Sequence, residues 1–217
     1  VERRGKGALV TGGGHGIGRA RGQRFAAEGA AGVGVVDLDG AAAEAVAAGI
    51  GATAIGIGCD VSDEAAVRDA VAATEARFGP LDLLVCNAGI GSMQGIEAPD
   101  AEWQRVWDVN VIGMARVSSA ALPSLRASPS AAIVNTGSAA ALVGVPQRAL
   151  YSATKGAVLA LTRAMATDHL REGIRVNAVN PGTADTPWIG RLLAAADDSA
   201  AERAALDARQ PHGRLVS

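Results

Sequence analysis

The chain has 217 residues and a formal net charge of −2, from 20 basic and 22 acidic side chains. That length predicts one domain, residues 1–217, with a sizeable apolar core. The near-even charge gives no electrostatic reason to expect a nucleic acid or an anionic membrane surface as a partner. No run approaches the ~18 consecutive apolar residues of a membrane span, and no secretory signal peptide opens the chain.

The two cysteines, Cys59 and Cys86, are too few for a disulfide scaffold. Each ends an apolar run, which favours two buried, reduced thiols. Together with the missing leader, this predicts a protein of the reducing cytoplasm.

Short β-rich apolar runs alternate with longer Ala-rich segments along the chain. The runs cover 8–10, 32–36, 52–57, 81–85, 131–135 and 174–179, and candidate helices lie near 17–28, 41–48, 63–78, 101–127 and 151–171. Six strands that alternate with helices predict a Rossmann-type α/β fold, in which a doubly wound parallel sheet lies between two helical layers. Ligands of such a sheet bind at the carboxyl ends of its strands, so the residues after each strand carry the functional argument.

The first run is followed by a glycine-rich turn, T-G-G-G-H-G-I-G at residues 11–18. Such a turn at the start of a helix lets backbone N–H groups approach a pyrophosphate. It is not a nucleoside-triphosphate loop, because Arg19 and Ala20 stand where that loop needs Lys and Ser or Thr. It also departs from the strict G-x-G-x-x-G fingerprint, because Ile17 stands at the third glycine position. A flexible turn without a ligand is the other interpretation.

The second run ends at Asp37, which comes 19 residues after Gly18. An acid about 20 residues beyond the glycine turn is expected to bind the adenosine ribose hydroxyls. Because a carboxylate repels a 2′-phosphate, Asp37 favours NAD over NADP. The alternative is that Asp37 only caps an exposed helix.

Tyr151, the one tyrosine of the chain, is followed four residues later by Lys155. The two share a helix face. A free tyrosine has a pKa of about 10, and a nearby ammonium favours its phenolate. Lowering that pKa by about 3 units requires roughly 4 kcal/mol. The pair also follows the strand that runs into Ser138, although a Tyr-x-x-x-Lys alone usually indicates packing or surface.

These residues resemble those of the short-chain dehydrogenase/reductase family, and the match covers nearly the whole chain. The matching features are the turn at 11–18, Asp37, Asp60-Val61, Asn87-Ala88-Gly89, Asn110, Ser138, Tyr151-x-x-x-Lys155, Arg175-Val176-Asn177 and the segment 181–187.

The resemblance implies that Tyr151 is the acid/base and that Lys155 lowers its pKa and binds the nicotinamide ribose. It implies that Ser138 hydrogen-bonds the substrate oxygen and that Asn110 helps hold a proton-relaying water. Asp60 and Val61 would meet the adenine, and residues 181–186 the nicotinamide side. The expected cofactor contacts are Gly12, His15, Gly16, Ile17, Gly18, Asp37, Leu38, Asp60, Val61, Asn87, Ala88, Gly89, Tyr151, Lys155, Pro181, Gly182, Thr183 and Thr186. No metal is expected.

Residues 183–213 would form the substrate lid. Arg191 and Arg209 flank its helical stretch, and Arg148 comes three residues before Tyr151. In placement these arginines resemble those of the 3-hydroxybutyrate and sugar-acid dehydrogenase subgroup, so we expect them to converge on an acidic substrate group. One alternative is that the three arginines are solvated on the surface. Another is that the indole of Trp188 forms the wall of an apolar pocket.

The resemblance also implies a homodimer or homotetramer that assembles through the helices at 101–127 and 151–171. Family members normally continue beyond the position of Ser217 with another helix and a seventh strand. Without them, the sixth strand is expected to be an unprotected edge of the sheet.

Three functions fit these features. The first is an NAD-dependent dehydrogenase of hydroxy acids, sugars or similar secondary alcohols. The second is a 3-oxoacyl-carrier-protein reductase, which would usually use NADPH, so Asp37 argues against it. The third is a non-catalytic dinucleotide-binding regulator, which would typically have lost the tyrosine or the lysine.

Overall fold

The computed structural model describes residues 4–194 and 196–216. Its strands all pair in parallel, in the order β3-β2-β1-β4-β5-β6. They are β1 (Gly7–Thr11), β2 (Gly32–Asp37), β3 (Ala54–Gly58), β4 (Leu83–Cys86), β5 (Ala132–Thr136) and β6 (Arg175–Val179). The predicted parallel sheet of six strands is confirmed, and β6 forms one of its edges.

The central strands are largely apolar because the sheet is covered on both faces. Every residue of β1 and β4 is buried, as expected for central strands of a parallel sheet. The chain moves from β1 outward to β2 and β3, then returns to place β4 on the other side of β1. The strand order therefore reverses between β1 and β4, where an open α/β sheet forms its ligand crevice.

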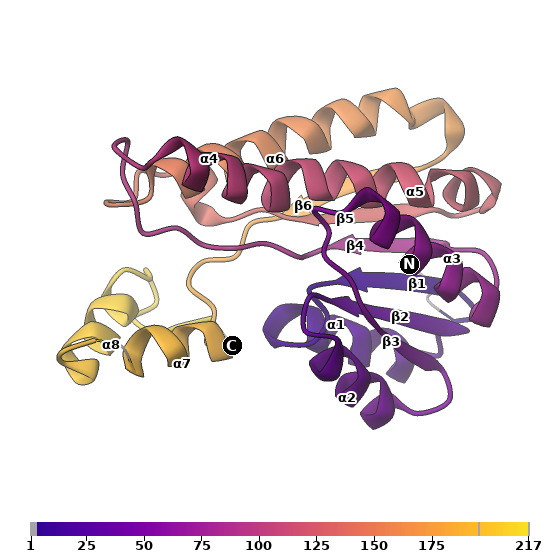
Figure 1. Ribbon diagram of the computed structural model, residues 1–217, viewed down its shortest axis with the longest axis horizontal. Coiled ribbons are helices and arrows are strands. Elements are labelled where there is room, and N and C mark those ends of the chain that lie inside the picture. The colour runs from indigo at the N-terminus through magenta and orange to yellow at the C-terminus, as the bar shows by residue number, and fades with distance from the viewer. Residues whose placement is uncertain (1–3, 195, 217) are drawn as a thin grey trace.

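The helices form two layers and a separate pair beyond the sheet (Figure 1). They are α1 (Gly16–Ala27), α2 (Gly40–Ile50), α3 (Glu64–Phe78), α4 (Asp100–Trp107), α5 (Gly113–Ala127), α6 (Ala149–Asp168), α7 (Pro187–Ala194) and α8 (Ser199–Ala208). The larger apolar cluster packs α3, α5 and α6 on one face of the sheet, and a smaller cluster packs α1 and α2 on the other.

The predicted continuous helix at 101–127 is wrong in one respect. Between α4 and α5, a π-helical turn covers Asp108–Ile112. The predicted helix at 151–171 begins earlier, at Ala149, and ends at Asp168, before a short 3₁₀ turn at Leu170–Glu172. The third and fourth strands begin two residues later than predicted, at Ala54 and Leu83.

The lid region has a small core of its own. Ile189 of α7, Leu206 of α8 and Leu215 near the chain end are buried together. Figure 1 shows α7 and α8 side by side at one end of the sheet, apart from the helices that cover its faces. Residue 195, inside the predicted lid, lies outside the described residues. Among those described, no helix is both long and apolar enough to cross a membrane.

Candidate active site

The glycine turn joins β1 to α1 at the point where the strand order reverses. Gly12 and Gly16 have left-handed backbones, with φ of +61° and +48°. A Cβ at Gly18 would lie 2.0 Å from the carbonyl oxygen of Gly12, so no side chain fits there. The first N–H groups of α1, which begins at Gly16, have no partner within the helix. His15 precedes them with an exposed side chain that makes no capping bond.

Asp37 holds the glycine turn from the end of β2. Its Oδ2 accepts the Gly14 N–H at 2.9 Å, and its Oδ1 accepts the Asp39 N–H at 3.1 Å. The cap of α2 is Asp39, which accepts the Ala42 N–H at 3.1 Å. The alternative that Asp37 serves only as a helix cap is therefore wrong. Leu38, beside it, is 74% exposed.

The end of β4 is hydrogen-bonded to the same turn. Thr11 Oγ1 accepts the N–H groups of Asn87 at 3.0 Å and Ala88 at 3.1 Å, and Asn87 Nδ2 donates to the Gly12 carbonyl at 3.1 Å. The Asn-Ala-Gly segment thus lies against the glycine turn. Because two strand ends fix each other here, the cradle has a defined shape before any ligand enters.

Asp60 closes a turn after β3. Its Oδ1 accepts both the N–H (2.8 Å) and the hydroxyl (2.7 Å) of Ser62, whereas α3 is capped by Asp63. Asp60 is therefore not the helix cap that remained as its alternative role. Its neighbour Val61 is buried against Gly113. Their contact with an adenine ring stays a prediction.

Asn110 lies in the π-helical turn and is fully buried. Its Oδ1 accepts the Ile90 N–H at 2.8 Å, and its Nδ2 donates to the Ile90 carbonyl at 3.0 Å and to Thr154 Oγ1 at 3.1 Å. Both amide protons are therefore used. The side chain links the segment after β4 to α6. A proton-relaying water could then hydrogen-bond only to the second lone pair of Oδ1 or to the main chain.

Lys155 extends from α6 beneath the ring of Tyr151. It is 4% exposed, and its Nζ donates to the Thr136 carbonyl at 2.8 Å. Nζ lies 5.8 Å from the centre of the Tyr151 ring. Burial disfavours the ammonium and lowers the pKa of Lys155 to about 8.

The pKa of Tyr151 is raised in this structure, because burial of the phenol is the largest effect on it. The Ser138 hydroxyl, within hydrogen-bonding reach, and the Arg148 charge both act in the opposite direction. The expectation that Lys155 lowers the pKa of Tyr151 therefore does not hold for the protein without a bound cofactor. Its ammonium lies below the ring and is hydrogen-bonded to a carbonyl, and Arg148 is the cation that counteracts burial.

Ser138 starts the loop after β5. Its N–H donates to Asn180 Oδ1 at 3.2 Å, and its Oγ accepts the Ala140 N–H at 3.2 Å. The hydroxyl proton takes no part in this bond and stays available as a donor. Ser138, from the loop after β5, lies close enough to Tyr151 of α6 to act on its pKa through a side-chain hydrogen bond.

Ala184 lies within the segment expected on the nicotinamide side, although it was not one of the individually predicted contacts. It forms a parallel bridge with Val216, in which Thr183 O accepts the Val216 N–H (2.9 Å) and the Asp185 N–H donates to Val216 O (2.8 Å). Successive residues of an extended segment point their polar groups to opposite sides. The N–H and C=O of Ala184 therefore face away from Val216, and neither has a hydrogen bond among the described residues. One donor beside one acceptor matches a primary carboxamide such as that of nicotinamide.

The lid contacts both sides of the crevice. A Cβ at Gly16 would lie 3.1 Å from Thr186 Cγ2, and a Cβ at Gly91 would lie 3.2 Å from the Trp188 indole. Large exposed apolar side chains gather on the surrounding segments: Met93, Ile96, Leu142, Val143 and Trp188.

The three arginines expected at the substrate do not form one cluster. The Arg148 guanidinium is partly buried and donates to the Ser92 carbonyl at 3.1 Å. Burial and then the charge of Arg209 lower the pKa of Arg148, so these two cations lie close together. Arg191 is exposed, and no described residue pairs with it. Gln147, just before Arg148, is the one non-glycine among the described residues with a positive φ, +55°.

The glycine cradle, the ribose-side acid and the Ser-Tyr-Lys group at one sheet edge define a dinucleotide-dependent oxidoreductase. A family model described as short chain dehydrogenase matches residues 6–196. The chain belongs to that family, and it is an oxidoreductase of the kind that transfers hydride between a secondary alcohol and a nicotinamide ring.

Two relatives and one solved structure illustrate the likeness. The chain is 46% identical to inactive 2-(S)-hydroxypropyl-CoM dehydrogenase 2 of Xanthobacter autotrophicus, over 88% of this chain and 84% of the relative. It is 40% identical to cis-4-hydroxycyclohexanecarboxylate dehydrogenase of Sinomonas cyclohexanicum, over 96% and 83%. A Brucella melitensis 3-ketoacyl-(acyl-carrier-protein) reductase complexed with NADH superposes with a TM-score of 0.88 at 36% identity, over 99% and 86%.

Proposed function

We propose that this protein is an NAD-dependent dehydrogenase of secondary alcohols that carry an acidic group, with Tyr151 as its acid/base. The observation that carries the proposal is the meeting of Ser138, Tyr151 and Lys155 beside the glycine cradle. A non-catalytic regulator would have no need of a buried ammonium under the phenol. The chain keeps all three side chains, although one similar protein is named as inactive.

The side chains divide the proton chemistry among them. In the oxidation direction, the Tyr151 phenolate takes the proton of the substrate hydroxyl, and Ser138 hydrogen-bonds the same oxygen. Lys155 places a positive charge under the phenol. Asn110 fixes the segment after β4 through its hydrogen bonds to Ile90. A bound nicotinamide supplies the hydride acceptor at its C4 carbon.

Asp37 supports NAD over NADP. Its carboxylate is held by two backbone N–H groups at the end of β2, so it cannot swing away from a 2′-phosphate without breaking both bonds. The glycine positions that exclude any Cβ support a pyrophosphate in the turn. The other predicted cofactor contacts, His15, Ile17 and Leu38 among them, belong to the same proposal.

Arg148 and Arg209 support an acidic substrate. Burial and the charge of Arg209 lower the pKa of Arg148, and Tyr151 and the Glu202 carboxylate act in the opposite direction. Guanidinium groups bind oxyanions with two parallel hydrogen bonds, which suits an acidic group of the substrate beside these two arginines. Arg191 is a weaker part of the proposal, because it lies exposed without a partner among the described residues. The carboxylate in the name of the Sinomonas relative agrees with such a substrate.

We further propose one cytoplasmic domain that assembles as a homodimer or homotetramer. Both cysteines are buried and free, which suits a reducing compartment. Light scattering of the purified protein gives the number of subunits.

The test of function is NADH formation over a panel of hydroxy acids, sugars, neutral secondary alcohols and 3-hydroxyacyl thioesters. We expect the largest kcat/KM among hydroxy acids. A preference for the thioesters would instead support the ketoreductase alternative. The choice of cofactor cannot separate the two, because the Brucella reductase is itself complexed with NADH.

A further inference from the structure

We infer that Gln210 is a positioning residue that holds residues 183–185 so that Ala184 presents its free N–H and C=O to the nicotinamide. The inference rests on the proposed function, because it concerns the nicotinamide half of the same site. Gln210 was not among the predicted site residues.

Gln210 binds Thr183 through both ends of its carboxamide. Its Oε1 accepts the Thr183 N–H at 3.3 Å, and its Nε2 donates to Thr183 Oγ1 at 3.1 Å. The carboxamide lies directly on Gly182, where a Cβ would be 2.4 Å from Oε1. A side chain at position 182 would displace Gln210, so this glycine makes the contact possible.

The direction of each polar group along residues 183–185 follows from these bonds. The Thr183 N–H bonds Gln210, and the Thr183 carbonyl and the Asp185 N–H bond Val216. All three therefore turn toward the lid. Only the N–H and C=O of Ala184 point toward the crevice. Their orientation depends on how firmly Thr183 and Asp185 are held.

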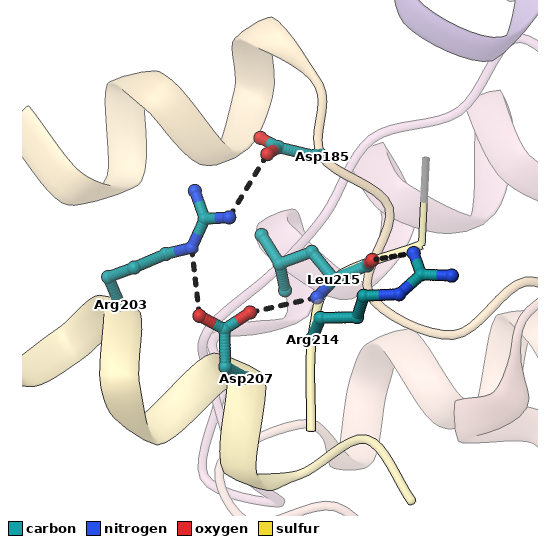
Figure 2. Close-up of polar contacts among 5 residues, drawn as sticks. All are labelled: Asp185, Arg203, Asp207, Arg214 and Leu215. Carbon is teal, nitrogen blue, oxygen red and sulfur yellow. Dashed lines mark hydrogen bonds and ion pairs between the residues drawn. The ribbon is translucent and has the colours of Figure 1, made fainter. Parts of the chain in front are cut away.

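Helix α8, which ends two residues before Gln210, fixes the other end of this segment (Figure 2). Arg203 lies between Asp185, at 3.2 Å, and Asp207, at 3.1 Å. Asp207 also accepts the Leu215 N–H at 2.8 Å. Both strands of the Ala184–Val216 bridge are thus bonded to α8, but Asp185 and Arg203 are 50% and 41% exposed. Exposed ion pairs contribute little, so Gln210 is the more important hold on the Thr183 side.

This arrangement predicts an effect confined to one half of the cofactor. Loss of the Gln210 bonds leaves the glycine cradle and Asp37 unchanged, since neither contacts the lid carboxamide. ADP-ribose, which lacks nicotinamide, should bind as before. NAD should bind more weakly, because the carboxamide partner at Ala184 is no longer fixed.

The experiment compares Gln210→Met, which keeps the length but loses both bonds, with Gln210→Glu, which keeps the acceptor for the Thr183 N–H. Calorimetry gives Kd for NAD and for ADP-ribose, and steady-state assays give kcat and both KM values. For Gln210→Met we expect a roughly 3- to 10-fold larger Kd for NAD, a lower kcat, and unchanged Kd for ADP-ribose and KM for the alcohol. Gln210→Glu should largely restore the NAD affinity. Gln23→Met, an exposed glutamine of α1, is the matched control.

Three results would overturn the inference: equal weakening of NAD and ADP-ribose, no change in either Kd or in kcat, or a change in the alcohol KM alone. If Gln210→Met does not fold, Gln210→Glu together with Gln210→Asn, which is one methylene too short, gives the same comparison. A wild-type protein that binds NAD but oxidises no alcohol would contradict the proposed function. The ratio of the two Kd values would still test Gln210.

Discussion

The catalytic wall and the lid are held in different ways. In the wall, formed by β5, α6 and the π-helical turn, the polar groups of Asn110, Thr154 and Lys155 are 0–4% exposed and bond one another or the main chain. In the lid, the side chains of Asp185, Arg203 and Asp207 are 27–50% exposed. Buried polar contacts are costly to break, whereas exposed ones are screened. The difference teaches that the polar contacts of the wall are harder to break than those that tie α8 to residues 183–185.

The largest effect should come from the wall. Tyr151→Phe keeps the ring packing but removes the acid/base, so kcat should fall by roughly 10²–10⁴-fold. The Kd for NAD should stay near the wild-type value. Stopped-flow or steady-state NADH formation measures the loss. Turnover close to wild type with any substrate would show that the wall is not where the proton transfer occurs.

The pH dependence of stability contributed by Lys155 tests how strongly burial in the wall disfavours its ammonium. Burial lowers its pKa to about 8, so the unfolded chain binds one more proton than the folded protein between about pH 8 and pH 10.4. Stability contributed by this site therefore rises with pH across that window, by up to about 3 kcal/mol. Below about pH 8 the full cost of the buried ammonium is present.

The measurement is urea unfolding of the cofactor-free wild type and of Lys155→Met at several pH values from 7 to 10. The difference in unfolding free energy should move in favour of the wild type as the pH rises. A difference independent of pH would show that Lys155 is not desolvated.

A double-mutant cycle links the two regions, because Arg148 belongs to the wall and Arg209 to the end of α8. If both bind the same acidic group, each Met variant should lower kcat/KM for a hydroxy acid by roughly 10- to 100-fold. The double variant should lose less than the product of the two. Arg191→Met is the control, with little change expected. Fully independent effects would indicate that wall and lid do not share the substrate anion.

Asp37→Asn tests the cofactor preference, at the end of β2. The amide oxygen can still accept the Gly14 N–H, so the glycine turn should keep its shape, but the repulsion of a 2′-phosphate is lost. We expect the preference for NAD over NADP to fall about tenfold. Paired kcat/KM values with the two cofactors measure it. An unchanged ratio would remove Asp37 as the selecting residue.

The smallest effect on global stability should come from Arg203→Gln in the lid. Its ion pairs are exposed, so the urea midpoint should not change measurably. Limited proteolysis within residues 185–215 should nevertheless become faster, because Asp185 loses its ion-pair partner and Asp207, which accepts the Leu215 N–H, loses the guanidinium that orients it. Arg68→Gln, an exposed ion-paired arginine of α3, is the control. A large fall in the midpoint would mean that the lid is as firmly built as the wall.

The secondary structure shows where reading the sequence succeeds. Central parallel strands are buried on both faces, so their uniform apolar runs are visible in the sequence, and the glycine turn is fixed by sterics at Gly12 and Gly18. The π-helical turn at Asp108–Ile112 was not predicted, since D-V-N-V-I has no local signal against an α-helix. It forms where Asn110 bonds Ile90, 20 residues away in the chain.

By itself the sequence determined the alternation of strands and helices, the glycine turn, the position of Asp37 and the spacing of Tyr151 and Lys155, because each depends on residue type at a local spacing. Tertiary structure decided that burial raises the pKa of Tyr151, that the charge of Arg209 rather than Arg191 acts on Arg148, and that Gln210 and Val216 leave the N–H and C=O of Ala184 free. These depend on desolvation and on backbone pairing between distant segments, and neither leaves a mark on residue type.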